Sequence, residues 1–257
     1  MLGRGEVKLL STLEHDRMGI FTVGDAQRIL ASSSVQSDRN TLSNLAKKGR
    51  IKRIKKGTYL LVPFRQKDWA EYDLSLVPLL VKDYYVSFWS ALRFWGMTEQ
   101  LPQQVYVAVR VPKRARRFEE ALYRFVVLTG RYFFGFEEVE IGGRKVRMAS
   151  KEKTILDCLL HPKYCGGLGE VAKAIRDNAE ELDWEKVRFF VEKAGSGSVE
   201  RRLRYCLDFF GLRWQLRLFG KKEFKGFLFL DPQGERKGKC NREFGLVINA
   251  DLEAELA

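Results

Sequence analysis

Hydrophobic side chains recur at helical spacing in the first thirty residues, in two runs that each carry a start or stop signal. The first run predicts a helix over residues 6–16, which ends before Gly19. In the second run, Thr22 resembles an N-cap, and Asp25 three residues later completes a variant of the capping box. The pattern therefore predicts two short amphipathic helices separated by a turn.

A third helix is predicted from a cap and a stop signal. Ser37 resembles an N-cap after the polar turn of residues 31–34, and Gly49 suits the left-handed conformation that follows many helix ends. The helix between these signals runs to Lys48. Its buried stripe is predicted to consist of Leu42, Leu45 and Ala46. Its exposed face is predicted to carry Ser37, Arg39, Asn40, Ser43, Asn44 and Lys47.

A basic hairpin is predicted to follow, in the segment AKKGRIKRIKKGTYLLVP at residues 46–63. Ile51, Ile54 and residues 59–62 supply its strands, and residues 55–57 supply its turn. The cations of this hairpin cannot all face a core, so most should project outward. They are Arg50, Lys52, Arg53, Lys55 and Lys56. Three helices, a glycine stop and a basic hairpin in this order predict a winged helix-turn-helix domain.

The chemistry of the third helix favours double-stranded DNA as its partner. Arg and Asn side chains form bidentate hydrogen bonds with guanine and adenine edges in the major groove, and Ser supplements them. The cations of the hairpin suit phosphates, which give affinity and register without sequence discrimination. The alternative is an ordinary solvated helix face, and the adjoining hairpin favours the groove-reading interpretation.

The rest of the chain alternates between strand-like and helix-like patterns, which predicts a larger mixed domain. A helix capped by Ser87 comes first. Strands are predicted over residues 103–111, 123–129, 132–141, 144–148, 224–230 and 244–248. Helices are predicted over residues 150–160, 169–181, 183–194 and 199–210. The expected class is α+β, with a winged helix-turn-helix domain at residues 1–65, a connector at residues 64–72 and an α+β C-terminal domain at residues 73–257.

Positive charge is concentrated where the hairpin lies. The chain of 257 residues has a formal net charge of +13, and residues 1–65 contain 13 Lys or Arg against 5 Asp or Glu. Residues 66–200 are almost balanced, with 21 against 20, and residues 201–257 contain 12 against 8. A local basic field attracts polyphosphate through counterion release, so this distribution supports nucleic-acid binding.

Hydropathy and cysteine placement favour a cytoplasmic protein without a membrane span. No segment reaches the roughly 18 uninterrupted apolar residues of a spanning helix, and the N-terminus lacks the apolar region of a signal peptide. Cys158, His161 and Cys165 have a spacing that invites a zinc assignment, but Pro162 should end the helix that would align them. We therefore expect reduced, buried cysteines, no metal and no cofactor.

No catalytic constellation is recognisable in the sequence. The glycine-rich residues 166–169 precede a helix but lack the Lys-Ser/Thr pair of a phosphate loop. A nuclease would need Glu137, Glu138, Glu140 and Lys153 gathered around a metal. Two arginine clusters form a candidate second basic patch, for a DNA backbone or an acidic protein. They are Arg114, Arg116 and Arg117, and Arg201, Arg202 and Arg204.

The order of several segments along the chain is informative about its family. The segments are KKGRIKRIKKGTYLL, then YVSFWSALRFWGM, then VRMASKEKTILDCLLHPKYCGGLGEVAKAI at residues 146–175, and finally FLDP and EFGLVIN. The third is the most specific, because it joins a strand, Ser-Lys-Glu-Lys-Thr-Ile-Leu-Asp, a proline, Gly-Gly and another helix. Together these segments resemble AbiEi-type antitoxins, which are transcriptional regulators of abortive-infection systems. The resemblance extends over nearly the whole chain.

This resemblance implies a winged-helix domain that binds inverted repeats upstream of its own operon, and a C-terminal domain with antitoxin activity. It also implies a nucleotidyltransferase-like toxin as the functional partner, counteracted without a stable complex, in a type IV toxin–antitoxin system of viral defence. By analogy, the DNA contacts lie on the third helix and the hairpin. A stand-alone winged-helix transcription factor and a nucleic-acid-processing enzyme are the alternatives.

Overall fold

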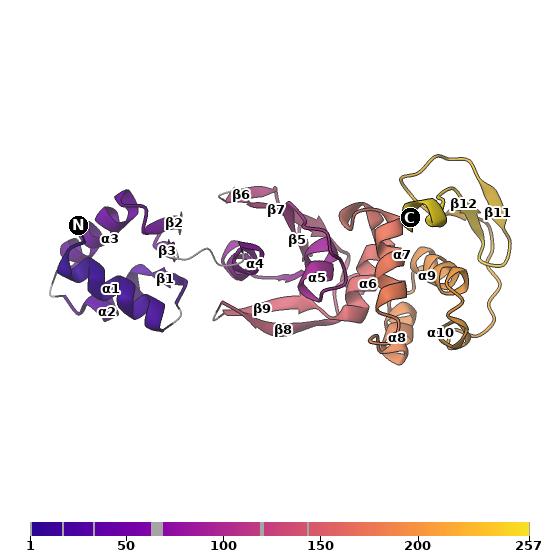
Figure 1. Cartoon of the computed structure of the whole chain (residues 1–257), viewed down its shortest axis with the longest axis horizontal. Coiled ribbons are helices and arrows are strands. Elements are labelled where there is room, and N and C mark those ends of the chain that lie inside the picture. The colour runs from indigo at the N-terminus through magenta and orange to yellow at the C-terminus, as the bar shows by residue number, and fades with distance from the viewer. Residues whose placement is uncertain are drawn as a thin grey trace. The chain divides into compact units, whose positions relative to one another are not determined.

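The structure is a computed structural model that describes residues 2–16, 18–32, 34–62, 69–118, 121–142 and 144–256. The side chains of residues 55, 69–73, 255 and 256 are outside this description. The chain divides into two compact units, one of residues 1–76 with 140–145 and one of residues 77–139 with 146–257. Both contain helices and strands (Figure 1), as the expected α+β class requires.

The first unit contains three helices and three short strands ahead of residue 62. They are α1 (Arg4–His15), β1 (Ile20–Thr22), α2 (Val23–Leu30), α3 (Val35–Lys47), β2 (Ile51–Lys55) and β3 (Thr58–Leu61). The strands form an antiparallel sheet in the order β1-β3-β2. The predicted capping box of α2 is confirmed, because the Asp25 amide donates to the Thr22 hydroxyl and the Thr22 amide donates to the Asp25 carboxylate. Strand β1 is missing from the sequence prediction, since three residues are too few to show a period.

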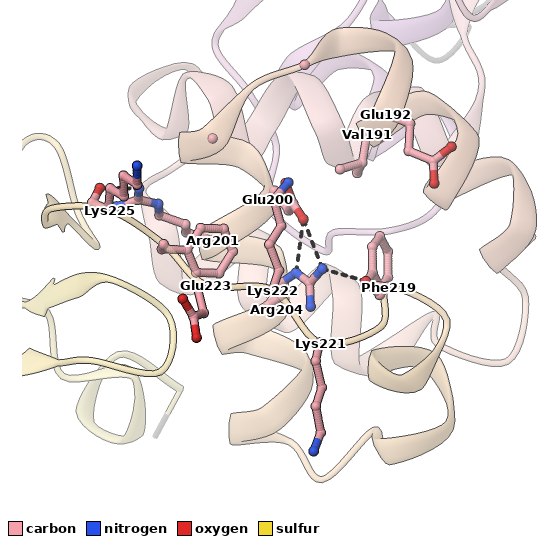
Figure 2. Close-up of a pocket in the computed structure, with 13 residues that line it drawn as sticks. Val191, Glu192, Glu200, Arg201, Arg204, Phe219, Lys221, Lys222, Glu223 and Lys225 are labelled. Carbon is pink, nitrogen blue, oxygen red and sulfur yellow. Dashed lines mark hydrogen bonds and ion pairs between the residues drawn. The ribbon is translucent and has the colours of Figure 1, made fainter.

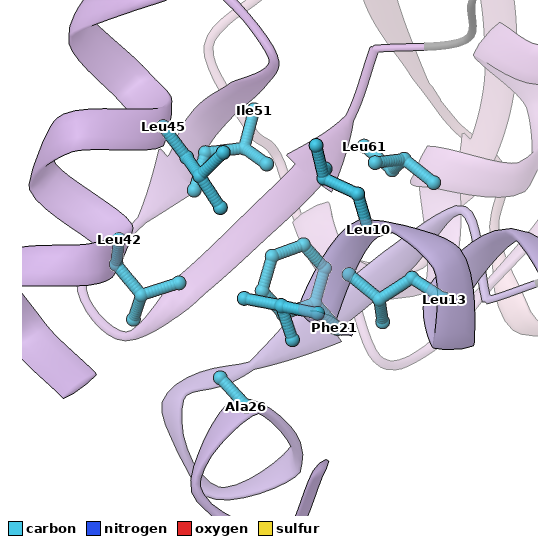
Figure 3. Close-up of a cluster of buried hydrophobic side chains, with 9 residues drawn as sticks. Leu10, Leu13, Phe21, Ala26, Leu42, Leu45, Ile51 and Leu61 are labelled. Carbon is cyan, nitrogen blue, oxygen red and sulfur yellow. The ribbon is translucent and has the colours of Figure 1, made fainter. Parts of the chain in front are cut away.

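Nine buried side chains form the core of this unit (Figure 3). Helix α1 contributes Leu9, Leu10 and Leu13, and α3 contributes Leu42 and Leu45. The other members are Phe21, Ala26, Ile51 and Leu61. Burial of a leucine side chain contributes about 1.5–3 kcal/mol, so the two leucines of α3 fix which of its faces meets the core. The opposite face is left to solvent.

Two details of α3 differ from the prediction. The N-cap is Ser34 and not Ser37, because the Ser34 hydroxyl accepts the Ser37 amide at 3.3 Å. Several serines precede the helix, and the left-handed Ala31, with φ 49°, turns the chain so that Ser34 occupies the cap position. Ala46 was expected in the core but is exposed. At this end of α3 the core contains only Leu42 and Leu45.

A six-stranded mixed sheet is the centre of the second unit. Its strands are β4 (Tyr84–Val86), β5 (Gln104–Val109), β6 (Arg116–Phe118), β7 (Ala121–Val127), β8 (Phe136–Ile141) and β9 (Arg144–Ala149). The order is β6-β7-β5-β4-β9-β8. Strand β5 pairs parallel with β7 and antiparallel with β4, which in turn pairs parallel with β9. Central strands β4 and β5 are buried almost throughout, as is usual for strands that are covered on both faces.

Helices and a small second sheet complete this unit. The helices are α4 (Trp69–Leu80, which begins in the first unit), α5 (Phe88–Phe94), α6 (Lys151–Leu160), α7 (Leu168–Asp177), α8 (Trp184–Ala194), α9 (Gly197–Phe209), α10 (Arg213–Arg217) and α11 (Leu252–Leu256). Short 3₁₀ turns lie at Gly130–Tyr132 and Pro162–Tyr164. Helix α6 packs against α5, α7, α8 and α9. The small sheet has the order β10-β12-β11, with β10 (Leu228–Phe229), β11 (Lys239–Asn241) and β12 (Leu246–Ile248).

Predictions for this unit hold best where a cap marks a helix. Ser150 and Asp183 cap α6 and α8, as the predicted starts at residues 150 and 183 require. The predicted strand over residues 224–230 is largely wrong, because only β10 has strand geometry there. Of the predicted connector at residues 64–72, the part up to 68 is outside the described residues, and α4 begins at Trp69.

Candidate nucleic-acid interface

The solvent face of α3 presents the side chains that the sequence singles out. All six are exposed, namely Ser37, Arg39, Asn40, Ser43, Asn44 and Lys47. The side chains of Arg39, Ser43, Asn44 and Lys47 form no hydrogen bond or ion pair with any residue that the structure describes. Their donors and acceptors are therefore directed to solvent and are free to meet an external partner.

This face carries no exposed carboxylate among its described residues. The acid in α3 is Asp38, which is 2% exposed and accepts a hydrogen bond of 2.6 Å from the Ser32 hydroxyl. Every other side chain of the helix is neutral or basic. The exposed face is consequently positive and polar, which lowers the electrostatic cost of bringing a polyanion close to it.

The earlier helix start adds Gln36 to this face. It is exposed, and its amide donates to the Asn40 side chain at 3.2 Å. Gln is one of the side chains suited to adenine in the major groove, so a Gln–Asn pair one turn apart extends the polar stripe. Ser34 is the last serine of the turn and directly precedes an apolar residue, Val35. Placing the N-cap there would have predicted from the sequence that Gln36 is part of this helix face.

The hairpin of β2 and β3 has the geometry of a short arm with outward cations. Ile51 and Ile54 are buried, which turns Lys52 and Arg53 outward, and a bulge between Arg53 and β2's last residue adds to the twist. The two-residue turn ends at Gly57, whose φ of 77° favours glycine. Lys52, Arg53 and Lys56 are exposed, Arg50 is half-buried, and the side chain of Lys55 is outside the described set.

An ion pair fixes the far end of α3 to the start of α1. The Lys48 ammonium lies 2.7 Å from the Glu6 carboxylate, which also accepts the Gly3 amide at 2.6 Å. The hydrogen bond from Lys48, followed by that from Gly3, holds the pKa of Glu6 below its ordinary value. Because Glu6 is buried and Lys48 is partly exposed, this pair orients the helix more than it adds charge to the surface.

The candidate second basic patch does not exist as one surface. Arg114, Arg116 and Arg117 are exposed in and before the edge strand β6, without an ion pair to any described residue. By contrast, Arg201, Arg202 and Arg204 are only 9%, 5% and 5% exposed. The prediction that these arginines of α9 form a surface patch is wrong.

The arginines of α9 instead bind backbone carbonyl groups of distant segments. Arg202 donates to the Leu159 and Leu230 carbonyls at 2.8 Å each. Arg201 donates to the carbonyls of Lys225, Gly226 and Gly245, all at 2.9 Å. Arg204 donates to Phe219 and Gly220 and pairs with Glu200. The guanidinium groups therefore hold the irregular segment 219–230 against α9.

The acidic residues considered for a nuclease are not gathered with the lysine. Glu137, Glu138 and Glu140 are exposed on β8, whereas Lys153 is 1% exposed and pairs with Asp157 inside the unit. A cluster of three or more potential metal ligands is absent from the part of the chain that the structure describes. The hypothetical nuclease site is therefore not assembled.

Lys153 and Asp157 form a buried polar network that the sequence does not reveal. The second oxygen of Asp157 accepts from the Tyr85 hydroxyl at 3.0 Å and from the Ser87 hydroxyl at 2.7 Å. Burial lowers the pKa of Lys153, and Asp157 opposes that shift. Ser87 does begin α5 as predicted, but its hydroxyl bonds to Asp157 rather than to the helix. The network joins α6 to the start of α5. Its side chains are almost fully buried, so we assign it a structural role.

The cysteine–histidine segment is compact but closed. Helix α6 ends at Leu160, and Pro162 begins a 3₁₀ turn, as expected from the proline. Cys158 and Cys165 are buried, and the Cys165 thiol donates to the His161 carbonyl at 3.8 Å. Burial raises the pKa of both thiols.

No helix within the described ranges is long and apolar enough to cross a membrane.

Comparison with known proteins supports the resemblance noted in the sequence. Residues 8–62 match the family model described as "Transcriptional regulator, AbiEi antitoxin". The structure is similar to the crystal structure of the RV2827C protein from Mycobacterium tuberculosis, with a TM-score of 0.68 and 13% identity, over 96% of this chain and 92% of that chain. At this identity the likeness shows a shared fold alone. No curated protein matches the chain in sequence.

Proposed function

We propose that this chain, whose residues 8–62 match the model of the AbiEi antitoxin transcriptional regulators, is a sequence-specific DNA-binding regulator. Its first unit then acts as a winged helix-turn-helix domain, with α3 in the major groove and the β2–β3 hairpin as the wing. The observation that carries this proposal is the exposed face of α3, which is polar, basic and without an exposed carboxylate among the described residues.

The order of elements supports this assignment. Four residues separate the end of α2 from the start of α3, which is the spacing usual in helix-turn-helix motifs. The hairpin follows α3 directly and places Lys52, Arg53 and Lys56 in solvent. Under this proposal, α3 reads base edges and the wing contacts phosphates.

A narrower proposal follows from the family description. The chain is the antitoxin of a type IV toxin–antitoxin pair, it represses its own promoter at inverted repeats, and a neighbouring gene encodes a nucleotidyltransferase-like toxin. The family description supports an antitoxin role in general terms. Growth assays with the neighbouring gene expressed alone, and then with this chain, separate this role from that of a stand-alone transcription factor.

The test of the DNA-binding proposal is a mobility shift of the full chain against the DNA upstream of its own gene, over a series of salt concentrations. We expect retarded bands that survive excess unrelated DNA, with log affinity falling against log salt by about 0.9 for each phosphate contacted. Equal competition by specific and unrelated DNA would refute sequence-specific regulation. A shift that is insensitive to salt would contradict the role of the wing.

A further inference from the structure

The second unit contains a cleft between the α8–α9 corner and the irregular segment 219–225 that the arginines of α9 hold in place (Figure 2). We call it the α9 cleft. Its volume is about 530 Å³, which is within the range of about 300–1,000 Å³ usual for small-ligand sites. Neither the DNA-binding proposal nor the antitoxin proposal uses it.

Positive charge dominates the lining of this cleft. Glu200 is neutralised by Arg204 at 2.9 Å and by Lys222 at 2.6 Å, and Glu192 lies 3.9 Å from Arg188. Among the lining acids, only the exposed Glu223 has no cation partner in the described structure. Lys221, Lys225 and Arg201 likewise have no carboxylate partner among described residues, so the cations are in excess.

Arg201 is the unusual member of this set. Its side chain is 9% exposed, and its terminal nitrogens bond only to neutral carbonyl groups. Its Nε is buried and has no hydrogen-bond partner in the described part of the structure. A buried cation without a counter-charge is costly, and an anion in the cleft would lower that cost.

The start of α9 adds a second source of positive potential. Gly195 and Gly197 line the cleft, and α9 begins at Gly197 with Ser196 as its N-cap. The first amides of a helix have no acceptor within the helix, and the helix dipole is positive at that end. Both features favour phosphate at this position.

Aromatic rings lie beside the cations. Phe219 and Phe224 line the cleft and are partly buried, with the guanidinium of Arg204 5.5 Å from the first ring and that of Arg201 4.8 Å from the second. An aromatic ring next to cations offers a stacking surface for a nucleobase whose phosphates meet the charge.

We propose that the α9 cleft binds a nucleoside phosphate, with the phosphates at the start of α9 and its neighbouring cations, and the base against a phenylalanine ring. The combination of an uncompensated buried arginine, a glycine-flanked helix start and two phenylalanine rings points to this ligand class. The terminal nucleotide of an RNA strand shares the same chemistry, so the test includes it. This inference does not depend on DNA binding.

Calorimetric titration of the full chain tests the proposal with ATP, GTP, AMP, inorganic triphosphate and a five-nucleotide RNA. We expect ATP or GTP to bind with a dissociation constant below about 1 mM and more tightly than inorganic triphosphate. Failure of every nucleotide to bind at that concentration would overturn the proposal. Equal affinity for inorganic triphosphate would overturn the assignment of a base-recognising site. Tighter binding of the RNA than of ATP or GTP would identify the ligand as the end of an RNA strand instead of a free nucleotide.

A variant at Gly197 separates charge from folding. A Cβ at this position meets no atom within 4 Å, and the backbone there is ordinary for any residue. Gly197→Asp puts a carboxylate at the helix start, where it favours the helix but repels phosphate, so affinity should fall at least about tenfold. The neutral, equally sized Gly197→Asn is the matched control and should change affinity less than about threefold. Equal affinities of the two variants would contradict the proposed phosphate position.

The lysines provide a second matched pair. Replacing Lys222 and Lys225 by alanine should weaken ATP binding, whereas replacing Lys237 and Lys239, which are exposed outside the α9 cleft, removes the same charge without this effect. Equal weakening by both double variants would show a general charge effect and would overturn the site assignment.

Discussion

The cations of α3 and its hairpin and the arginines of α9 are alike in chemistry and opposite in environment. On the first unit, Arg39 and Lys47 extend from one helix face into solvent. On the second unit, Arg202 is 5% exposed although it lies in a basic run with Arg201 and Arg204. A cluster of basic residues in the sequence therefore does not indicate whether their side chains contact an external partner or the backbone of the protein itself.

The difference follows from where backbone hydrogen bonds are missing. In the hairpin, β2 and β3 pair with each other through backbone hydrogen bonds, and the side chains of Arg53 and Lys56 are exposed. Segment 219–230 has strand geometry only at β10, and its carbonyls need other donors. Arginine has five N–H donors, and α9 places three arginines where those carbonyls lie. The exposed set is thus available for recognition, and the buried set holds the fold.

The largest effect expected from this contrast is on the buried arginines. Arg202→Ala leaves the Leu159 and Leu230 carbonyls without their donor in a buried site. We expect the free energy of unfolding of the second unit to fall by about 3 kcal/mol or more. Urea denaturation followed by circular dichroism measures this change. A loss below about 1 kcal/mol would mean that water replaces the guanidinium and that the burial is not structural.

The next effect is on DNA recognition and rests on the proposed function. Asn44→Ala should reduce the preference for the specific site over other DNA by about 1–3 kcal/mol, because it removes a base-reading amide. Lys56→Ala, in contrast, should weaken all DNA sequences alike and reduce the slope of log affinity against log salt by about 1. Competition mobility shifts measure both. If the two variants behaved identically, the division between a reading helix and a phosphate-binding wing would be wrong.

A smaller effect concerns the ion pair that anchors α3. The pKa of Glu6 is lowered in the folded protein, chiefly by Lys48, so the unfolded chain binds more protons in acid. This stabilisation is present above the unfolded pKa of about 4.3 and is lost as the pH falls through the lower folded value. Its size is about 1 kcal/mol, since Lys48 is partly exposed.

Glu6→Gln removes the ionising group and is the matched change for this pair. At pH 7 the variant should be less stable to urea than the natural chain. The gap should narrow as the pH falls below the unfolded pKa of about 4.3 and close once the pH is below the lower folded pKa of Glu6, because both chains then lack the carboxylate. A gap that stays constant across this range would show that the Glu6 charge contributes nothing to folding.

The smallest effect belongs to the exposed arginines of the second unit. Arg116→Ala should change the free energy of unfolding by less than about 0.5 kcal/mol, because Arg116 has no ion pair with a described residue. It is therefore the control for Arg202→Ala in the same denaturation series. A large loss at Arg116 would break the contrast between solvated and buried arginines.

Local signals account for the elements that the sequence predicts well. Thr22 with Asp25, Ser150 and Asp183 mark helix starts, because a cap is a contact between residues three apart. Gly49, with φ 66°, ends α3 for a similar reason. The resemblance to AbiEi antitoxins was also visible in the sequence, and it is confirmed over residues 8–62.

The sequence by itself thus determined the starts of α2, α6 and α8, the basic hairpin, the α+β class and the resemblance of residues 8–62 to AbiEi antitoxin regulators. Only the tertiary structure decided that Arg202 is buried and that the Lys153–Asp157 pair, four residues apart on α6, is buried beside Tyr85. The physical reason is distance along the chain. Capping and periodicity act within one helical turn, whereas the acceptors of Arg202 lie 28 and 43 residues away and Tyr85 lies 72 residues from Asp157. Burial of a charge depends on those distant partners, and no local pattern contains them.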